Sequence, residues 1–312
     1  MSHASTAHDP RAATLERLST LLCRELPEDG RRTAPDGLFF LVRHDRPSLG
    51  GHCFEKPLAS LIVQGSKRIL LGSREVAIHA GQSMVAAVDM PSATLSMEAT
   101  PERPFLSLFF LLDRRILSDL LLELPAGGAA DAAPRHCRPE AAPAGVSVTD
   151  AAPDYADAML RLAALLETPD RFAMLAPIFL RELHGLLLLG PHGSVLRELY
   201  ARGSKNRQII EAIAYLRRNL TRPLRVEDVA REAHMSVSSL HRHFKGVTGF
   251  SPLQFRKKLR LHEALRLMLA ENERAATAAA AVGYESVTQF TREYKRMFGE
   301  PPHRDIARRR GD

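Results

Sequence analysis

The sequence predicts an α+β protein. An N-terminal β-barrel with helices after it precedes an all-α C-terminal domain, in which two helix-turn-helix units are joined by a long helix. Short apolar runs bounded by Gly and Pro fill residues 38–111 and predict the barrel. Apolar residues at helical spacing, and two stretches about fifty residues apart that repeat one plan, predict the C-terminal domain.

The N-terminal half begins with a helix over residues 12–26, where Leu15, Leu18, Leu22 and Leu26 recur at helical spacing. Short strand-like runs follow at 38–43, 58–63, 67–71, 75–78, 83–88, 93–97 and 105–111. Gly and Pro separate these runs, as they do in small barrels and sandwiches. A barrel of this size can hold one small ligand.

Helices and loops connect the barrel to the C-terminal domain. We expect helices over 114–124, 150–168 and 170–189, the last with a kink at Pro177, and a mobile loop in the Ala-, Pro- and Gly-rich stretch 125–145. The domains are expected at 1–190 and 207–312, with a linker over 191–206. The helices after the barrel either pair two subunits or only cover the barrel.

The first helix-turn-helix unit spans residues 226–245. Ser236 can cap its second helix through the hydroxyl, and Leu240 and Phe244, four residues apart, face inward. A recognition helix contacts base edges with its first turns. The outer face at the start of this helix carries the candidate base contacts Ser238, His241 and Arg242.

The second unit spans residues 275–295 and repeats the plan. Gly283 permits the turn, and Ser286 caps the second helix. Lys295 occupies the place of Lys245 in the first unit, and both are expected to contact phosphates. The candidate base contacts on its outer face are Thr288, Gln289 and Arg292.

A helix from about Pro252 to about Glu271 joins the two units. About twenty residues at 1.5 Å rise give roughly 30 Å, close to the ~34 Å of one DNA turn, so the units can enter successive major grooves. Four cationic residues on this helix are expected near the DNA backbone, namely Arg256, Lys257, Lys258 and Arg260.

Charge is divided between the two halves of the 312-residue chain, whose formal net charge is +7. Residues 201–312 hold 23 Lys and Arg against 12 Asp and Glu, a surplus of 11 positive charges. Residues 1–200 therefore carry a net charge of −4. A basic C-terminal domain beside a mildly acidic N-terminal domain fits nucleic-acid binding at one end of the chain.

The C-terminal third, about residues 206–308, resembles the DNA-binding domain of the AraC/XylS family of bacterial transcription regulators. The strings that carry the resemblance are SPLQFRKKLRL at 251–261, VGYES at 282–286 and FTREYKRMFGEPP at 290–302. The resemblance assigns base contacts to the same six residues already singled out. The chain departs from the family at Ala275 and Ala278, where such regulators often carry larger aliphatic residues, which predicts a less filled core in the second unit.

The N-terminal half also resembles this family. The turn around Gly81 and Gln82 is similar to that of a cupin barrel, and FEKPLASLIVQGSKRILLG at 54–72 is similar to the N-terminal domain of one AraC-type subfamily. In a regulator of this kind an effector sits in the barrel. The candidate lining residues are Arg43, His44, Cys53 and Gln64, with Lys67 and Arg68 further along; the alternative is that the charged ones point outward and that Gln64 lies in a turn.

An enzyme is not expected. Metal-dependent cupins pair two histidines one residue apart, whereas His44, His52 and His79 are separate, so neither a metal site nor a cofactor is predicted. The three cysteines, Cys23, Cys53 and Cys137, predict no disulfide framework, although Cys53 is a candidate redox sensor against the commoner inert cysteine. No signal peptide and no apolar stretch of membrane-spanning length are apparent, which predicts a cytoplasmic protein.

We therefore expect a sequence-specific transcription regulator whose DNA binding a small molecule controls. Its expected partners are promoter DNA, an unidentified effector, RNA polymerase if it is an activator, and a second copy of the chain. Two alternatives stay open. One is a constitutive DNA-binding protein whose barrel only forms dimers, and the other is a metal-dependent cupin enzyme fused to a DNA-binding domain.

Overall fold

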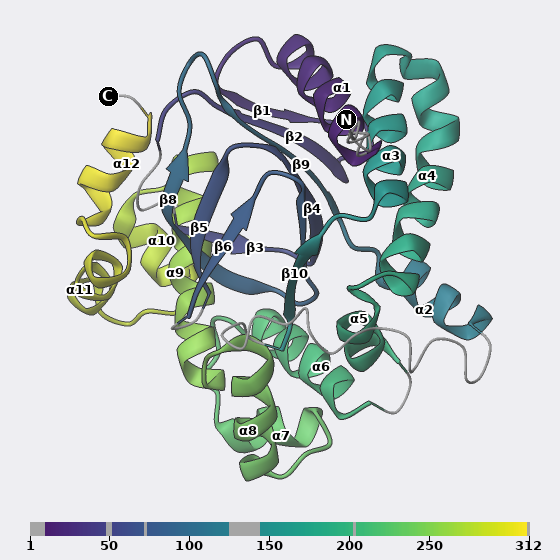
Figure 1. Ribbon diagram of the computed structural model, residues 1–312. Helices are drawn as coiled ribbons and strands as arrows, with labels where there is room; N and C mark the ends of the chain where they lie inside the picture. The colour runs from purple at the N-terminus through teal and green to yellow at the C-terminus, as the bar shows by residue number, and fades with distance from the viewer. Residues whose placement is uncertain (1–9, 48–51, 72–73, 125–143, 202–203, 311–312) are drawn as a thin grey trace, which may run out of the picture.

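The computed structural model describes residues 10–47, 52–71, 74–124, 144–201 and 204–310 (Figure 1). Its N-terminal part is built from two antiparallel sheets. The first has the strand order β1-β2-β9-β4-β7-β10, and the second the order β3-β8-β5-β6. The strand bounds are β1 Gly30–Thr33, β2 Phe39–His44, β3 His52–Glu55, β4 Leu58–Gln64, β5 Ser66–Leu71, β6 Arg74–His79, β7 Gln82–Ala86, β8 Met90–Glu98, β9 Phe105–Leu111 and β10 Val146–Asp150.

Strand β4 lies at the centre of the first sheet, between β9 and β7. Its residues 58–63 are all buried, so neither of its faces meets solvent. Helices α1 (Pro10–Glu25) and α3 (Pro153–Ala164) lie beside this sheet in Figure 1, and α1 contacts both β4 and α3. Leu18 and Leu22 of α1 are fully buried, as the helical spacing of the leucines predicts.

The structure adds three strands to those expected from the sequence, β1, β3 and β10. The edge strand β1 has the sequence GRRT, which shows no apolar pattern. Strand β10 comes after the Ala- and Pro-rich stretch, far along the sequence from the other strands. Each forms through pairing with a partner strand, β2 for the first and β7 for the second. The expected mobile loop lies, from 125 to 143, outside the described residues.

Helix α2 (Arg114–Glu123) follows β9, and α3 and α4 (Pro169–Leu189) follow β10, with a short 3-10 turn at Leu165–Glu167 between them. Pro177 lies inside α4, as expected. The expectation that no apolar stretch reaches spanning length is wrong for α4, whose 21 residues are long and apolar enough to cross a membrane by length and composition alone. A core helix of a globular domain passes the same test, and α4 packs against α3.

The segment expected as a linker contains a helix, α5 (Gly193–Tyr200). Four of its apolar residues are buried, Val195, Leu196, Leu199 and Tyr200. The sequence signal was hidden because a helix of eight residues is too short to show two full repeats, and because glycines at 190, 193 and 203 suggested a break. The linker assignment over 191–206 is therefore corrected for 193–200.

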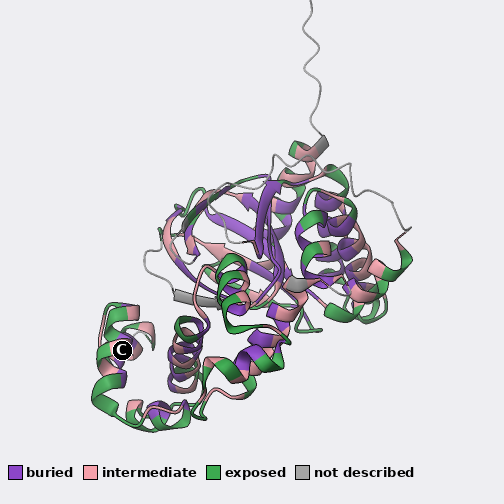
Figure 2. Cartoon of the chain, turned by 90° about the horizontal axis from the view of Figure 1, so that it is seen from below, coloured by how far each residue is buried: buried purple, intermediate pink, exposed green. Residues whose placement is uncertain are grey.

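The C-terminal part is helical and contains both expected helix-turn-helix units. The helices are α6 Lys205–Arg218, α7 Val226–Glu232, α8 Val237–Thr248, α9 Pro252–Ala270, α10 Ala275–Ala281, α11 Val287–Phe298 and α12 Pro302–Arg310. We call α7–α8 the first unit and α10–α11 the second unit. Figure 2 shows the strands mostly buried and the outer faces of these helices largely exposed.

The hydrophobic core divides within α9 rather than at residue 206. One cluster runs from the strands through α5 and α6 to the first unit and ends at Leu259. A separate cluster begins at Leu261 and fills the second unit. The first unit is thus continuous with the N-terminal core, whereas the second unit packs on the far half of α9.

Backbone hydrogen bonds also fasten the first unit to the sheet. The amide of Ala144 donates to the carbonyl of Gly246 at 2.8 Å, and the amide of Gly145 donates to that of Val247 at 3.1 Å. These carbonyls belong to the C-terminal end of α8, where carbonyls lack partners within the helix. A Cβ at Gly145 would lie 2.9 Å from the Val247 oxygen, so only glycine fits this approach.

Candidate nucleic-acid interface

The recognition helices α8 and α11 begin in the same way. The hydroxyl of Ser236 accepts a hydrogen bond from the amide of Ser239 at 3.3 Å, and the hydroxyl of Ser286 accepts one from the amide of Gln289 at 3.2 Å. Both caps were expected from the sequence and are confirmed. They fix the first turn of each helix, which is the turn that would meet base edges.

All six candidate base contacts are exposed at the beginnings of these helices. In the first unit they are Ser238, His241 and Arg242, and in the second they are Thr288, Gln289 and Arg292. Arg242 and Arg292 are each the sixth residue of their helix, so the repeat expected from the sequence holds in the structure. Exposed hydroxyls, amides and guanidinium groups offer the donors and acceptors that distinguish base pairs in the major groove.

The turn of the second unit differs from that of the first by one additional residue, Glu285. Gly283 adopts a φ of +84°, and a Cβ there would lie 2.6 Å from the carbonyl oxygen of Thr221. The corresponding residue of the first unit, His234, has a φ of 51°. A left-handed backbone alone tolerates the histidine of the first unit, so it is the close approach of Thr221 that requires glycine at 283.

The core of the second unit is filled by aromatic rings. Ala278 and Ala279 are fully buried against it. The rings of Tyr294 and Phe298 have centroids 4.4 Å apart, and those of Phe290 and Tyr294 are 5.5 Å apart. The small alanines thus lie in one buried cluster with large rings, and the less filled core expected from Ala275 and Ala278 stays a prediction.

Helix α12 braces the recognition helix of the second unit. The hydroxyl of Tyr294 donates to Asp305 at 2.8 Å, and Asp305 is fully buried. Arg308 and Arg309 donate to the other oxygen of this carboxylate, at 2.7 and 2.8 Å. A buried charge is retained only where such partners satisfy it.

The four candidate phosphate contacts differ in how free their charges are. Lys245 and Lys295 are exposed on the recognition helices. Lys257 forms an ion pair with Glu293 at 2.7 Å. Lys258 lies 4.9 Å from the ring centre of Phe250, and burial lowers the pKa of its ammonium.

Two of the arginines of α9, Arg256 and Arg260, are hydrogen-bonded within the protein. Arg256 donates to the carbonyl oxygens of Leu220 and Arg222, and Arg260 donates to that of Leu220 at 2.7 Å. Burial, with a smaller effect of neighbouring Arg260, lowers the pKa of Arg256 to about 10. Both guanidinium groups therefore hold the 220–222 segment in place, and their expected contact with phosphates stays a prediction.

Three of the candidate effector residues meet at one end of the first sheet. Arg43 is paired with Leu106, His44 with Phe105, and Gln64 with Leu106 in the strand register. Their polar groups are engaged within the protein: Arg43 donates to Asp45 at 2.6 Å, His44 lies 3.3 Å from Asp29, and Gln64 donates to the Pro104 carbonyl at 2.8 Å. The Asp45 carboxylate also raises the pKa of Arg43.

The candidates Lys67 and Arg68 both belong to β5. Arg68 is exposed and forms an ion pair with Glu75 at 2.7 Å, in keeping with an outward strand charge, while Lys67 is half-buried. The side chain of Cys53 lies outside the described part of the structure, as does Cys137. Cys23 has a free thiol.

A cavity that sequence reasoning missed lies beside Gln64. Its volume is about 390 Å³, and its walls come from the β4–β5 turn, the β6–β7 turn and the β8–β9 loop. Its lining residues are Gly65, Ser66, His79, Ala80, Glu98, Ala99, Thr100 and Arg103. These residues are scattered over forty positions of sequence and carry no shared pattern, so only the folded sheet brings them together.

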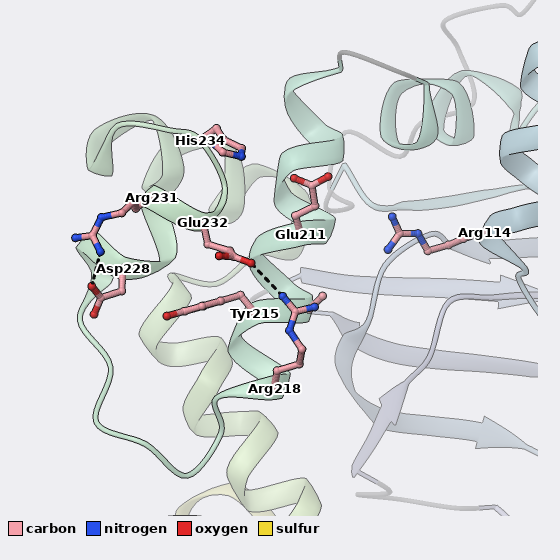
Figure 3. Close-up of a pocket in the computed structure, with 9 residues that line it drawn as sticks. Arg114, Glu211, Tyr215, Arg218, Asp228, Arg231, Glu232 and His234 are labelled. Atoms are coloured by element: carbon pink, nitrogen blue, oxygen red, sulfur yellow. Dashed lines mark hydrogen bonds and ion pairs between the residues drawn. The ribbon is translucent and has the colours of Figure 1, made fainter.

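A larger cavity of about 540 Å³ lies between α2 and the first unit (Figure 3). Arg114 of α2 forms one wall, and Glu211, Tyr215 and Arg218 of α6 form another. Residues of and after α7 close it, with ion pairs between Arg218 and Glu232 at 3.1 Å and between Arg231 and Asp228 at 3.4 Å. In the parts of the chain that the structure describes, no group of three or more His, Cys, Asp or Glu is placed to hold a metal ion.

Comparison with known families divides the chain in two. Residues 37–195 match the model of the AraC-type transcriptional regulator N-terminus, and residues 229–308 match that of a helix-turn-helix domain. The first match covers half of the chain, and the second begins within α7 and covers the rest of both units.

Individual proteins resemble it over shorter stretches. The chain is 32% identical over 91 residues to the uncharacterized HTH-type transcriptional regulator YobQ of Bacillus subtilis, which is 29% of this chain and 38% of that protein. It is 29% identical over 135 residues to the HTH-type transcriptional regulator ExsA of Pseudomonas aeruginosa, 42% of this chain and 47% of that protein. The chain thus spans less than half the length of these curated relatives.

Among solved structures, unsaturated fatty acid bound ToxT from Vibrio cholerae is similar in fold. The TM-score is 0.56 at 13% sequence identity, over 86% of this chain and 94% of that one. An apo form of ToxT gives a TM-score of 0.55 at 12% identity, over 88% of this chain and 98% of that one. The arrangement of two sheets followed by two helix-turn-helix units is therefore shared with these structures.

Proposed function

Because the chain belongs to the AraC/XylS family of transcription regulators, we propose that it binds specific sites in promoter DNA through α8 and α11, under the control of a small molecule. The observation that carries the proposal is the matched pair of recognition helices, each capped by a serine and each exposing an arginine at its sixth position. The proposed base contacts are Ser238, His241, Arg242, Thr288, Gln289 and Arg292.

The proposed role is regulation rather than catalysis, in the cytoplasm, with RNA polymerase as a further partner if the protein is an activator. Lys245 and Lys295 are the proposed phosphate contacts with the freest charges. A constitutive DNA-binding protein remains the competing proposal, and it would bind DNA equally well with and without any metabolite.

Selection of bound duplexes from a random-sequence pool tests DNA recognition. Arg242→Ala and Arg292→Ala should each weaken the selected duplex by about 1–3 kcal/mol and relax the base preference at one position. Arg171→Ala on α4, which removes an exposed arginine far from both units, should change neither quantity. Failure to enrich any sequence with the unaltered protein would refute the proposal.

The effector is proposed to bind in the N-terminal domain, at the cavity beside Gln64 or at the adjoining sheet end with Arg43 and His44. His79, Glu98 and Arg103 give this cavity both charge signs. Binding there must alter DNA affinity and be altered by DNA to the same degree. A metabolite screen by thermal shift, repeated with Arg103→Ala, tests this, and an effector whose binding ignores DNA would contradict it.

We further propose that α4 pairs two copies of the chain. Met174, Ile178 and Leu189 of α4 and Leu122 of α2 are large, apolar and more than half exposed. Sedimentation of Ile178→Lys should then show a smaller assembly than the unaltered protein. Leu269→Lys, a matched change at an exposed leucine of α9, should sediment like the unaltered chain.

A further inference from the structure

Glu293 of α11 stands at the centre of a polar network in the second unit. Its side chain is 17% exposed. One carboxylate oxygen lies 2.7 Å from the ammonium of Lys257 and accepts a 3.4 Å hydrogen bond from the side-chain amide of Gln289. The other oxygen accepts a 2.8 Å hydrogen bond from the hydroxyl of Tyr284. Burial raises the pKa of Glu293, but the bonds from these three donors outweigh it and keep the carboxyl ionised.

Two of these donors are among the residues expected to contact DNA. Gln289 is a candidate base contact, and Lys257 is a candidate phosphate contact. A negative charge beside the phosphate backbone opposes binding. Glu293 therefore lowers affinity for any duplex, both by its own charge and by pairing with Lys257.

The same network can sharpen base recognition. A glutamine reads adenine with its carbonyl oxygen and one N–H, and its amide has two N–H groups. With one N–H directed to Glu293, the other N–H and the oxygen of Gln289 are presented together in one orientation. Fixing a side chain before binding reduces the entropy lost on binding and disfavours other bases.

The network belongs to the second unit alone. The seventh residue of α8, which matches Glu293, is His243. A cavity of about 300 Å³ adjoins the network, with Leu253, Lys257, Gly283, Tyr284, Gln289 and Glu293 among its lining residues. This space gives the Lys257 side chain room to leave Glu293.

We propose that Glu293 is a specificity-determining positioning residue, which withholds Lys257 from phosphates and orients the Gln289 amide. The inference rests on the proposed function, because it requires α11 to read base pairs. With this carboxylate, α11 has a lower affinity for DNA of any sequence and discriminates more strongly between base pairs than it would without it.

Two substitutions separate the two effects. Glu293→Gln keeps the shape and an acceptor for Gln289 but loses the charge that pairs with Lys257. Glu293→Ala loses both. The probes are a duplex selected from a random pool by the unaltered protein and a scrambled duplex of the same composition, with dissociation constants measured over a series of salt concentrations.

Both variants should bind the scrambled duplex roughly two- to fivefold more tightly, the range of one surface ion pair. Both should also steepen the dependence of log affinity on log salt by about 0.9, the effect of one additional phosphate contact. Only Glu293→Ala should lose base preference. The loss should fall on the base pair of the selected duplex at which Gln289→Ala also loses preference.

Two controls isolate the network. Glu285→Gln removes an exposed carboxylate from the same cavity without releasing Lys257, and should leave the salt slope unchanged. In a Lys257→Ala background, Glu293→Gln should no longer steepen the slope. An unchanged slope in Glu293→Gln, or a parallel loss of specific and scrambled binding, would mean that Glu293 is only structural. Absence of any selected duplex for the unaltered protein would instead refute the proposed function.

Discussion

Tyr294→Phe tests whether α12 holds the recognition helix of the second unit. The substitution removes one oxygen and leaves the ring in the aromatic cluster with Phe290 and Phe298. What it deletes is the 2.8 Å hydrogen bond to Asp305, whose side chain is fully buried.

The expected loss of stability follows from the hydrogen bonds that the Asp305 carboxylate keeps after the substitution. Arg308 and Arg309 donate to one oxygen of its carboxylate, while Tyr294 donates to the other. The substitution would leave that second oxygen buried with a donor missing. Hydrogen bonds to charged groups contribute about 1.5–3 kcal/mol, and an unsatisfied buried acceptor costs a similar amount. The local opening of α11 should therefore become roughly ten- to a hundredfold more frequent.

Hydrogen exchange of the full chain measures this opening directly. Amides of residues 287–298 should exchange faster in the variant, while those of α8, residues 237–248, serve as an internal control because they belong to the other core cluster. Equal exchange in α11 before and after substitution would refute the bracing role. Equal acceleration in both helices would show that the two units open together, contrary to the division of the core at α9.

Three further changes test other parts of the structure. Gly145→Val should break both hydrogen bonds to the end of α8, about 1 kcal/mol each, and speed amide exchange at 144–148, because its side chain would collide with the Val247 carbonyl. Burial lowers the pKa of His192 from 6.5 to about 4, so His192 takes up its proton at a higher pH in the unfolded chain than in the folded one. The contribution of His192 to the free energy of unfolding should therefore be complete above about pH 6.5 and decline by roughly 3 kcal/mol toward pH 4. Urea unfolding over this pH range measures the decline, which should be absent in His192→Asn. Lys245→Ala should reduce the salt slope of DNA binding by about 0.9, and Lys258→Ala by less, because the Lys258 ammonium is partly buried over a ring.

The strongly periodic elements were predictable from the sequence. Repeated leucines marked α1, and apolar runs between glycines and prolines marked the strands from β4 to β9. Elements that depend on distant partners were not. Strand β10 exists because it pairs with β7, some sixty residues earlier, and α5 exists because its apolar face meets a core built elsewhere. Neither has a local pattern long enough to reveal it.

Sequence reasoning placed the exposed side chains of the helices better than the polar side chains of the sheets. A helix repeats its faces every few residues, so Arg242 and Arg292 could be placed outward from spacing alone. In the first sheet, Arg43 and Gln64 come from different strands, and their hydrogen bonds to Asp45 and Pro104 depend on loops that spacing does not describe. The cavity beside Gln64 is likewise a property of strand ends brought together by the fold.

Counting charges overstates how many cations can meet DNA. The C-terminal region holds 23 Lys and Arg, yet Arg256 and Arg260 bind the carbonyls of the 220–222 segment, Arg308 and Arg309 neutralise Asp305, and Lys257 is paired with Glu293. The surplus of positive charge attracts DNA from a distance whichever residues carry it, because the long-range field depends on the sum. The salt slope, by contrast, depends on the cations that displace counterions at the surface. Fast, long-range attraction and a modest salt slope are therefore expected together, since many of these guanidinium groups are occupied in holding the two units in shape.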